Sequence, residues 1–206
     1  MITTIVFDFG KVLVDYDFDC FFRKLRTDYP LPDSAFQKFM QIIFDEKTYS
    51  DFDRESTPID QQVQRLMAEH PDCAMLFEAF SQRFQEVVTG EVPGMCQLLT
   101  ELRGKGYKLY GLSNWSSKVY DTMRRFPHIF SQLQGRVLSC EEHLLKPEPE
   151  IYACLLHRFS LNAEECVFID DKQANVDGSI NAGIDAILFT GAENLRQELR
   201  MRGVDC

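Results

Sequence analysis

Residues 3–10, TTIVFDFG, decide the fold, because they form an unbroken apolar run that ends in a carboxylate, Asp8, and a turn glycine. A second apolar run at residues 166–169, CVFI, ends in Asp170 and Asp171. Continuous apolar strands are typical of parallel sheets that are buried on both faces. In such open sheets, ligands bind in the crevice beyond the carboxyl ends of the strands. The sequence therefore predicts an α/β protein with two acidic strand ends at one crevice.

A third run, residues 108–112, ends in Ser113 and Asn114, so that a hydroxyl and an amide follow this strand. Lys146 stands before Pro147 and leads into a helical pattern at residues 151–159. Oxygen-rich side chains suit a hard divalent cation, and a lysine suits a phosphate. The four polar positions together indicate a site for a metal ion and a phosphate.

The order of the remaining patterns indicates how the chain is divided. Strand-like runs at residues 3–8, 107–112, 136–139, 166–170 and 185–189 alternate with helical stretches, as in βαβ units. The interval between the first two runs is too long for one crossover helix. We therefore expect a core at residues 1–16 and 89–206, interrupted by an inserted helical segment at residues 17–88.

Within the insertion, the apolar pattern predicts helices at residues 18–25, 34–44, 59–69 and 73–88. Thr57 and Pro58 fit an N-cap and a first helical position. Residues 45–56 are polar and aromatic and are predicted to form a loop. This loop is either a plain connection or a surface that contacts the substrate. Our candidates for selecting that substrate are residues 49–54, Arg54 above all, together with Tyr16, Phe18 and Phe44.

Composition excludes several classes of partner. The formal net charge of -10, from 32 acidic and 22 basic residues, and the absence of a basic stripe argue against nucleic acid. The seven cysteines form no C-x-x-C pair and indicate reduced thiols, and no leader or long apolar segment is visible. We expect a cytoplasmic protein that binds neither nucleic acid nor membrane; the sequence carries no signal for an oligomeric state.

Each polar position also has a purely structural interpretation. Asp8 alone could cap a turn, Ser113 could begin the helix expected at residues 117–125, and Lys146 could be a surface lysine. The adjacent pair Asp170 and Asp171 favours the functional interpretation, because neighbouring carboxylates repel each other unless a cation keeps both ionised. Mg²⁺ is the expected ion.

Taken in order, D-x-G-x-V at Asp8, S-N at Ser113, K-P at Lys146 and D-D-x-x-x-N-x-x-G at Asp170 resemble the four motifs of the haloacid dehalogenase (HAD) superfamily of hydrolases. The resemblance covers the whole chain. It implies a Rossmann-like parallel sheet flanked by helices, with the insertion as a helical C1-type cap. It also implies a phosphatase that acts on a small phosphorylated metabolite.

The resemblance further implies the role of each site residue. Asp8 would be the nucleophile that takes up the phosphoryl group. Asp8, the carbonyl of Gly10 and Asp170 would hold Mg²⁺, with Asp171 acting through a water or behind the ligands. Ser113 and Asn114 would bind the phosphoryl oxygens. Lys146 would offset the charge shared by the phosphate and Asp8.

One position departs from the superfamily pattern. Most of its phosphatases carry a second aspartate two residues after the nucleophile as general acid and base, where this chain has Gly10. General acid–base help is worth on the order of 10² to 10⁴ in rate. Its loss favours acidic leaving groups, such as those of sugar 1-phosphates or acyl phosphates, or another acid. Lys11, Asp15 and Asp17 are the nearby candidates for that acid, unless they only form a solvated turn.

The D-x-G variant resembles a cap-bearing subgroup that includes α-glucose-1-phosphate phosphatases and the N-terminal phosphatase domain of epoxide hydrolases, so a sugar phosphate is the first substrate guess. Two other hypotheses remain. A 2-haloacid dehalogenase uses the same aspartate on carbon without a metal, but carries a neutral pair where this chain has Asp170 and Asp171. A silent member of the superfamily would keep the fold and only bind a metabolite or a protein.

Overall fold

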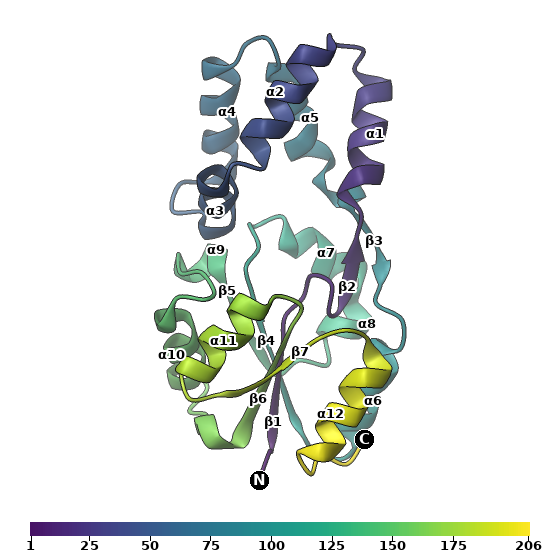
Figure 1. Ribbon diagram of the computed structural model, residues 1–206, viewed down its shortest axis with the longest axis vertical. Helices are drawn as coiled ribbons and strands as arrows, with labels where there is room; N and C mark the ends of the chain where they lie inside the picture. The colour runs from purple at the N-terminus through teal and green to yellow at the C-terminus, as the bar shows by residue number, and fades with distance from the viewer.

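The computed structural model describes residues 1–206 and has a five-stranded parallel sheet at its centre (Figure 1). The strands lie in the order β5-β4-β1-β6-β7, and every neighbouring pair is parallel. Their bounds are β1 (Thr4–Phe7), β4 (Lys108–Ser113), β5 (Gly135–Leu138), β6 (Cys166–Asp170) and β7 (Asp185–Leu188). These are the five predicted runs, so the predicted parallel α/β sheet is confirmed.

The strand order places the first acidic residue at the point where the sheet changes direction. From β1 the chain moves outward to β4 and β5, and then returns to β6 on the other side of β1. Phe7 lies opposite Ile169 of β6, so Asp8 and Asp170 leave the sheet side by side. Such a reversal opens a crevice at the carboxyl ends of the strands.

Helices cover both faces of the sheet. Ile5 and Phe7 of β1 pack in one core with Leu98 of α6 and Leu195 of α12, and Val6 packs in the other core with α10 and α11. The bounds are α6 (Met95–Gly104), α7 (Val119–Arg125), α8 (Pro127–Phe130), α9 (Ser139–Glu142), α10 (Pro149–Arg158), α11 (Gln173–Asn181) and α12 (Ala192–Met201), with a 3-10 turn at Ala163–Glu165. No helix has the length and apolar character that crossing a lipid bilayer would require.

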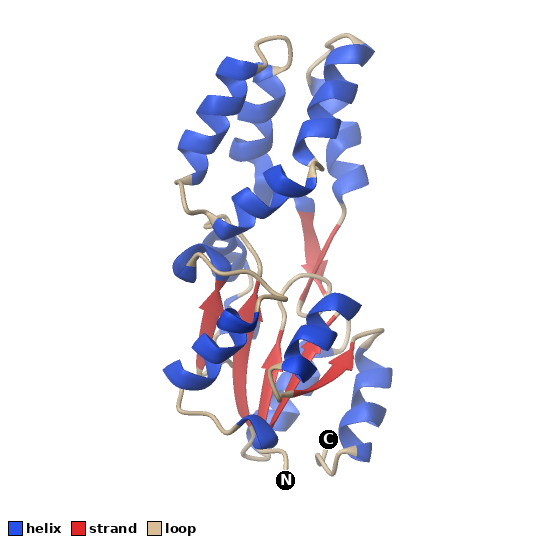
Figure 2. Cartoon of the chain, turned by 60° about the vertical axis from the view of Figure 1, so that its left-hand side comes forward, coloured by secondary structure: helices blue, strands red, loops and turns tan.

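Five helices form a second body above the carboxyl ends of the strands (Figures 1 and 2). They enclose their own core of 17 buried residues, many of them phenylalanine. Two short antiparallel strands, β2 (Val14–Tyr16) and β3 (Val88–Glu91), connect this body to the sheet. The helices are α1 (Phe18–Asp28), α2 (Asp33–Ile43), α3 (Glu46–Arg54), α4 (Ile59–Glu69) and α5 (Ala74–Arg83), followed by a 3-10 turn at Phe84–Val87.

The structure corrects three expectations about the inserted segment. Residues 45–56, predicted as a loop, contain helix α3, whose first turn is capped by Asp45 accepting a hydrogen bond from Thr48 N at 3.1 Å. The helix expected over residues 73–88 ends earlier, at Arg83. The α4 cap is Pro58 rather than Thr57, and the Glu55 carboxylate accepts from Ile59 N at 3.2 Å instead.

Candidate active site

Three carboxylates meet where β1 and β6 end. Asp8 follows β1, Asp170 is the last residue of β6, and Asp171 comes directly after it. Oxygen atoms of the three carboxylates all lie within 4.8 Å of one another. The side chain of Asp8 is 10% exposed, and that of Asp170 is fully buried. The sheet therefore brings together the acidic residues that the sequence placed at one crevice.

The ammonium group of Lys146 lies between these carboxylates. Its Nζ lies 2.9 Å from Asp8 Oδ1 and 2.6 Å from Asp170 Oδ2, and it also donates to the carbonyl of Leu112 at 3.0 Å. Burial by itself would lower the pKa of Lys146, but the charges of Asp8 and Asp170 outweigh it and raise the pKa. The lysine is therefore a fixed, charged group and not a surface residue.

Asp8 is an unusual carboxyl because it is buried beside both a cation and another carboxylate. Burial, with a smaller contribution from Asp170, raises its pKa to about 6 against the opposing effect of Lys146. The backbone N–H of Phe9 donates to Asp8 Oδ1 at 2.7 Å. Above neutral pH the group is a carboxylate that is only weakly solvated, which suits a nucleophile.

Ser113 and Asn114 lie close to this cluster, but their side chains make different contacts. The Ser113 hydroxyl is buried without a hydrogen-bond partner, which is rare for a buried polar group. It does not begin a helix, because α7 starts only at Val119. The Asn114 side chain donates to Lys146 O at 2.9 Å and accepts from Lys146 N at 2.8 Å. Asn114 therefore fixes the backbone of Lys146.

The two aspartates of β6 have different environments. Asp170 accepts hydrogen bonds from Lys146 Nζ, from Lys172 N at 2.8 Å and from Asn175 Nδ2 at 3.0 Å. Asp171 instead lines the cavity, and burial together with Asp170 raises its pKa. The oxygens of Asp170 are thus engaged by three donors, whereas Asp171 faces the cavity; which of the two contacts the ion stays a prediction.

A cavity lies between the strand ends and the helical body. Its floor includes Asp8, Gly10, Lys146 and Asp171. Much of its wall is aromatic, made by Tyr16, Phe18, Tyr49, Phe84 and Trp115. Two further charged residues line it: Asp53 of α3, which lies in the segment expected to select the substrate, and Lys172, which the sequence did not single out. The signal for Asp53 was its place in the polar and aromatic segment at residues 45–56.

Arg54 lies elsewhere, contrary to the expectation that it contacts the substrate. Its guanidinium forms a bidentate ion pair with Glu148 and donates to the carbonyl of His143 at 2.9 Å. It is absent from the wall of the cavity. The helical position of Asp53 and Arg54 explains this correction, because consecutive helical residues point in different directions.

The three residues considered as replacements for an acid at position 10 have structural contacts of their own. Lys11 Nζ lies 2.6 Å from Asp15 Oδ1 and donates to the carbonyl of Tyr16 at 2.7 Å. The Asp17 carboxylate caps α1 by accepting from Cys20 N at 2.8 Å. None of the three lines the cavity, in agreement with their interpretation as a solvated turn.

The fold and the carboxylate cluster after its first strand define a class of α/β proteins with a Rossmann-like parallel sheet and an inserted helical segment. The chain belongs to the haloacid dehalogenase-like hydrolase family, whose model matches residues 2–183. This match confirms the superfamily that the four motifs resemble.

Several curated proteins are similar to parts of the chain. Acyl-CoA dehydrogenase family member 10 of Mus musculus is 32% identical over 120 residues, which are 58% of this chain and 11% of that protein. Flavin mononucleotide hydrolase 1 of Arabidopsis thaliana is 26% identical over 54% of this chain and 45% of its own length. Sesquiterpene phosphatase astK of Aspergillus oryzae is 29% identical over 52% of this chain and 54% of its own length. The chain thus spans about half or less of these relatives.

Solved structures are similar over nearly the whole chain. An HAD family enzyme from Bacteroides thetaiotaomicron superposes with a TM-score of 0.76 at 20% identity, covering 97% of this chain and 98% of that one. The same enzyme in complex with magnesium and inorganic phosphate gives a TM-score of 0.73 at 19% identity, covering 97% and 100%. L-2-haloacid dehalogenase from Xanthobacter autotrophicus superposes with a TM-score of 0.61 at 17% identity, covering 100% of this chain and 85% of that one. At these identities the likeness concerns the fold.

Proposed function

We propose that this protein is a Mg²⁺-dependent phosphatase that hydrolyses a small phosphorylated metabolite through a phosphoryl-aspartate on Asp8. The observation that carries the proposal is the buried Asp8 carboxylate held 2.9 Å from Lys146 Nζ. A phosphate that approaches Asp8 brings a second anion, and a fixed cation at this distance offsets the repulsion. The Ser113 hydroxyl supports the same function. It has no partner within ordinary hydrogen-bond distance but lies close enough to Asp8 to lower the pKa of that carboxyl, so a phosphoryl oxygen at Asp8 would accept its hydrogen bond.

The donor set fits a hard divalent cation. The carboxylates of Asp8 and Asp171 and the carbonyl of Gly10 are oxygen ligands on the floor of one cavity, as Mg²⁺ prefers. Asp170 is better described as the residue that fixes Lys146, because its oxygens already accept three donors. When bound, Mg²⁺ would neutralise charge on the transferring phosphoryl group. The related HAD family enzyme solved with magnesium and phosphate supports this choice of ion.

The residues of the chain account for both halves of the reaction. An Asp8 oxygen attacks phosphorus, the bond from phosphorus to the leaving oxygen breaks, and the leaving oxygen takes a proton. Water then attacks the phosphorus of the phosphoryl-aspartate, which releases inorganic phosphate and restores Asp8. Lys146 holds positive charge beside the site in both steps, and Ser113 donates to a phosphoryl oxygen.

The cavity suggests which substrates to test first. Aromatic side chains, among them Tyr16, Tyr49 and Trp115, offer flat apolar faces to the part of the substrate that carries the phosphate. Such faces suit sugar rings, so sugar phosphates remain the first candidates. The names of two relatives add flavin mononucleotide and glyceraldehyde 3-phosphate to the panel: flavin mononucleotide hydrolase 1, and a glyceraldehyde 3-phosphate phosphatase of Pyrococcus abyssi that is 28% identical over 48% of this chain and 42% of its own length.

The test is phosphate release from this panel and from a phenolic phosphate ester, with Mg²⁺ and with EDTA. Wild type is compared with Asp8→Asn and with Asp60→Asn, a control at an exposed aspartate of α4. We expect metal-dependent release from wild type and the control, and none from Asp8→Asn. Halide release from a 2-haloacid without metal would instead indicate a dehalogenase. Release of neither product from folded protein would indicate a silent binder.

A further inference from the structure

The side-chain space next to Gly10 is already filled. A Cβ atom built on Gly10 would lie 3.0 Å from Tyr16 Cε1 and 3.9 Å from Trp115 Cζ3. An acidic side chain at position 10 would therefore displace the Tyr16 ring. Tyr16 itself is a poor acid, because burial raises its pKa above that of a free phenol. The proton for the leaving group has to come from another wall of the cavity.

Asp53 is the carboxyl on the opposite, helical wall of the same cavity. Its backbone is fixed to the sheet domain, because its carbonyl accepts a hydrogen bond from Ser139 Oγ at 2.6 Å. The next two residues are fixed as well. Arg54 pairs with Glu148, and the Glu55 carboxylate accepts from Ser117 N at 2.6 Å. This end of α3 thus presents Asp53 to the cavity from a rigid base.

Burial raises the pKa of Asp53 to about 7, with a further contribution from Asp8 and opposing ones from Lys172 and Lys146. The groups that face it are these three charges, the Tyr49 phenol of its own helix and the Tyr16 phenol of β2. Asp53 therefore keeps a proton at a pH where an exposed aspartate would have lost it. A general acid works best when its pKa is near the working pH.

We propose that Asp53 is the general acid that replaces the missing aspartate at position 10. Asp53 donates its proton to the leaving oxygen as the bond from phosphorus breaks, and the resulting carboxylate regains a proton from the water that attacks the phosphoryl-aspartate. This proposal rests on the proposed function. It also removes the need for an acidic leaving group, so ordinary alkyl phosphates become substrates.

The experiment measures leaving-group release in the first turnover for Asp53→Asn, with an alkyl phosphate and with a phenolic ester. We expect a fall on the order of 10² to 10⁴ for the alkyl phosphate and almost none for the phenolic ester, whose leaving group needs no proton. Asp51→Asn on the same helix is the control. Equal losses on both substrates, or a loss on neither, would overturn the assignment. Failure of wild type to release phosphate would instead contradict the proposed function.

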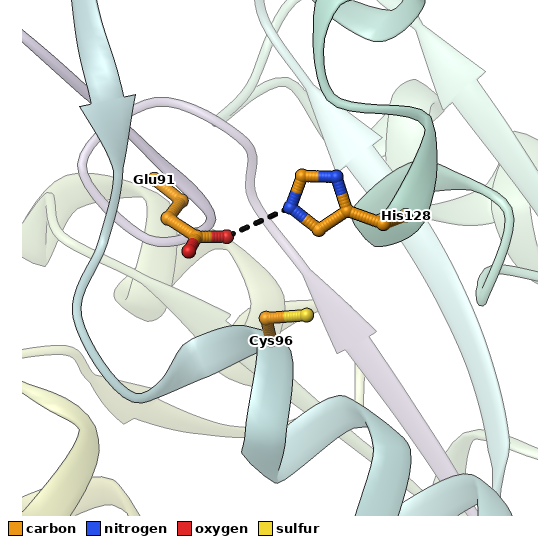
Figure 3. Close-up of side chains that lie close together, drawn as sticks. All are labelled: Glu91, Cys96 and His128. Carbon is orange, nitrogen blue, oxygen red and sulfur yellow. Dashed lines mark hydrogen bonds and ion pairs between the residues drawn. The ribbon is translucent and has the colours of Figure 1, made fainter.

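A second inference comes from a cluster outside the active site. Glu91 of β3, Cys96 of α6 and His128 of α8 converge at the surface of the sheet domain (Figure 3). His128 Nε2 lies 3.0 Å from Glu91 Oε2, and the Cys96 sulfur lies within 4.8 Å of both ligand atoms. An ion pair would explain Glu91 and His128, but it does not require a thiol from a third element.

Neighbouring residues hold the side chains of this cluster in place. The buried Gln132 side chain donates to the carbonyl of His128 at 3.1 Å, and its Nε2 lies 3.5 Å from the carbonyl of Cys96 and 3.9 Å from the sulfur. Glu91 is held by strand pairing with Val14. The side chains of His128 and Glu91 are 53% and 46% exposed, so an ion can enter from solvent.

We infer that Glu91, Cys96 and His128 form a Zn²⁺ site with one position left for water. A carboxylate, a thiolate and an imidazole at this spacing match the ligands and the coordination number of zinc, whereas Mg²⁺ avoids sulfur and nitrogen. Zinc here would clamp β3, one of the two strands that lead to the helical body, onto α6 and α8.

Co²⁺ titration tests the site, because a cobalt–thiolate bond gives a charge-transfer absorption that oxygen ligands cannot give. No cysteine lines the catalytic cavity, so ions bound there do not contribute. We expect the band in wild type, in Asp8→Asn and in Cys20→Ser, its displacement by Zn²⁺, and its loss in Cys96→Ser. His128→Gln, at an exposed position, should weaken it without unfolding. No band in wild type would show that the cluster is only a surface ion pair. A band kept in Cys96→Ser would show that this thiolate is not a ligand. Either result would overturn the inference.

Discussion

Lys146 places one positive charge between two buried carboxylates, and this arrangement ties stability to the chemistry of the site. Its Nζ contacts Asp8, Asp170 and the Leu112 carbonyl, so all three of its hydrogens have acceptors. A buried ion of this kind is stable only while its partners remain. The same contacts hold the cation where a transferring phosphate needs it.

Replacing Lys146 by methionine should therefore destabilise the protein strongly. Asp8 and Asp170 would lose their shared cation, and breaking a buried pair typically costs about 3–5 kcal/mol. Urea unfolding of Lys146→Met at pH 7.5 measures the loss. The double variant Lys146→Met/Asp170→Asn should recover a large part of the stability without recovering activity. A single variant as stable as wild type would contradict the buried triad.

Replacing Asp53 should stabilise the protein, which is the opposite of the effect expected for replacing Lys146. The pKa of Asp53 is raised from 3.8 to about 7 in the folded protein, so the unfolded chain loses its proton first. Stability therefore falls as the pH rises from about 4 to about 7 and levels off above that. Asp53→Asn cannot ionise and should escape this loss. At about 1.4 kcal/mol per pKa unit the upper limit is roughly 4 kcal/mol, and we expect about 1–3 kcal/mol because the carboxyl borders an open cavity.

Thermal unfolding from pH 4 to pH 8.5 checks this prediction. Asp53→Asn and wild type should unfold at similar temperatures near pH 4, and the variant should become progressively more stable than wild type up to about pH 7, with a constant difference from there to pH 8.5. Asp60→Asn, at an exposed site, should follow wild type. A variant that is less stable than wild type at pH 8.5 would show that the Asp53 carboxylate makes favourable contacts there.

At the scale of elements, the sheet was predictable and helix α3 was not. The three central strands, β1, β4 and β6, are mostly apolar runs that are buried almost throughout, and that pattern is visible without a structure. Helix α3 has nine residues and only Phe52 is buried, so its apolar period is too short to recognise. The strands β2 and β3 have three and four residues and were missed for the same reason.

The site residues also differ in how far the sequence could predict them. Asp8, Ser113, Lys146 and Asp170 follow strands or a motif and could be found from the sequence. The roles of Asp53 and Arg54 depend on the turn of α3, which puts one residue at the cavity and the next at Glu148. Which of Asp170 and Asp171 faces the cavity depends on side-chain contacts that no spacing reveals.

Helix α3 fixes the helical body to the sheet domain, and the Arg54–Glu148 pair tests this role. Both side chains are about one-third exposed, 31% and 35%, so we expect a contribution of about 1 kcal/mol. Arg54→Ala and Glu148→Ala should raise KM alike for a sugar phosphate and for a phenolic ester, and the double variant should be little worse than either single one.

The outcome that contradicts this role is equally specific. If Arg54→Ala raised KM only for the larger substrate while Glu148→Ala changed nothing, Arg54 would contact the substrate directly. The original expectation from the sequence would then be correct, and the pair with Glu148 would be a state that the substrate replaces.

At the scale of the whole molecule, the active site is completed by two bodies that are far apart in the sequence. The sheet domain supplies Asp8, Lys146 and Asp171, and the helical body supplies Asp53 and Tyr49. Consecutive residues of α3 hold the two bodies together through Ser139, Glu148 and Ser117. We therefore expect the site to exclude water when these contacts form and to exchange substrate when they break.

The central claim is the covalent bond between Asp8 and phosphorus, and the most direct measurement is to trap it. Borohydride added during turnover reduces a phosphoryl-aspartate to homoserine, which mass spectrometry locates in the peptide that contains residue 8. We predict this modification at Asp8 when both Mg²⁺ and substrate are present, and none with EDTA or in Asp8→Asn. Turnover that releases phosphate without modification at Asp8, or with modification at another carboxylate, would contradict the account.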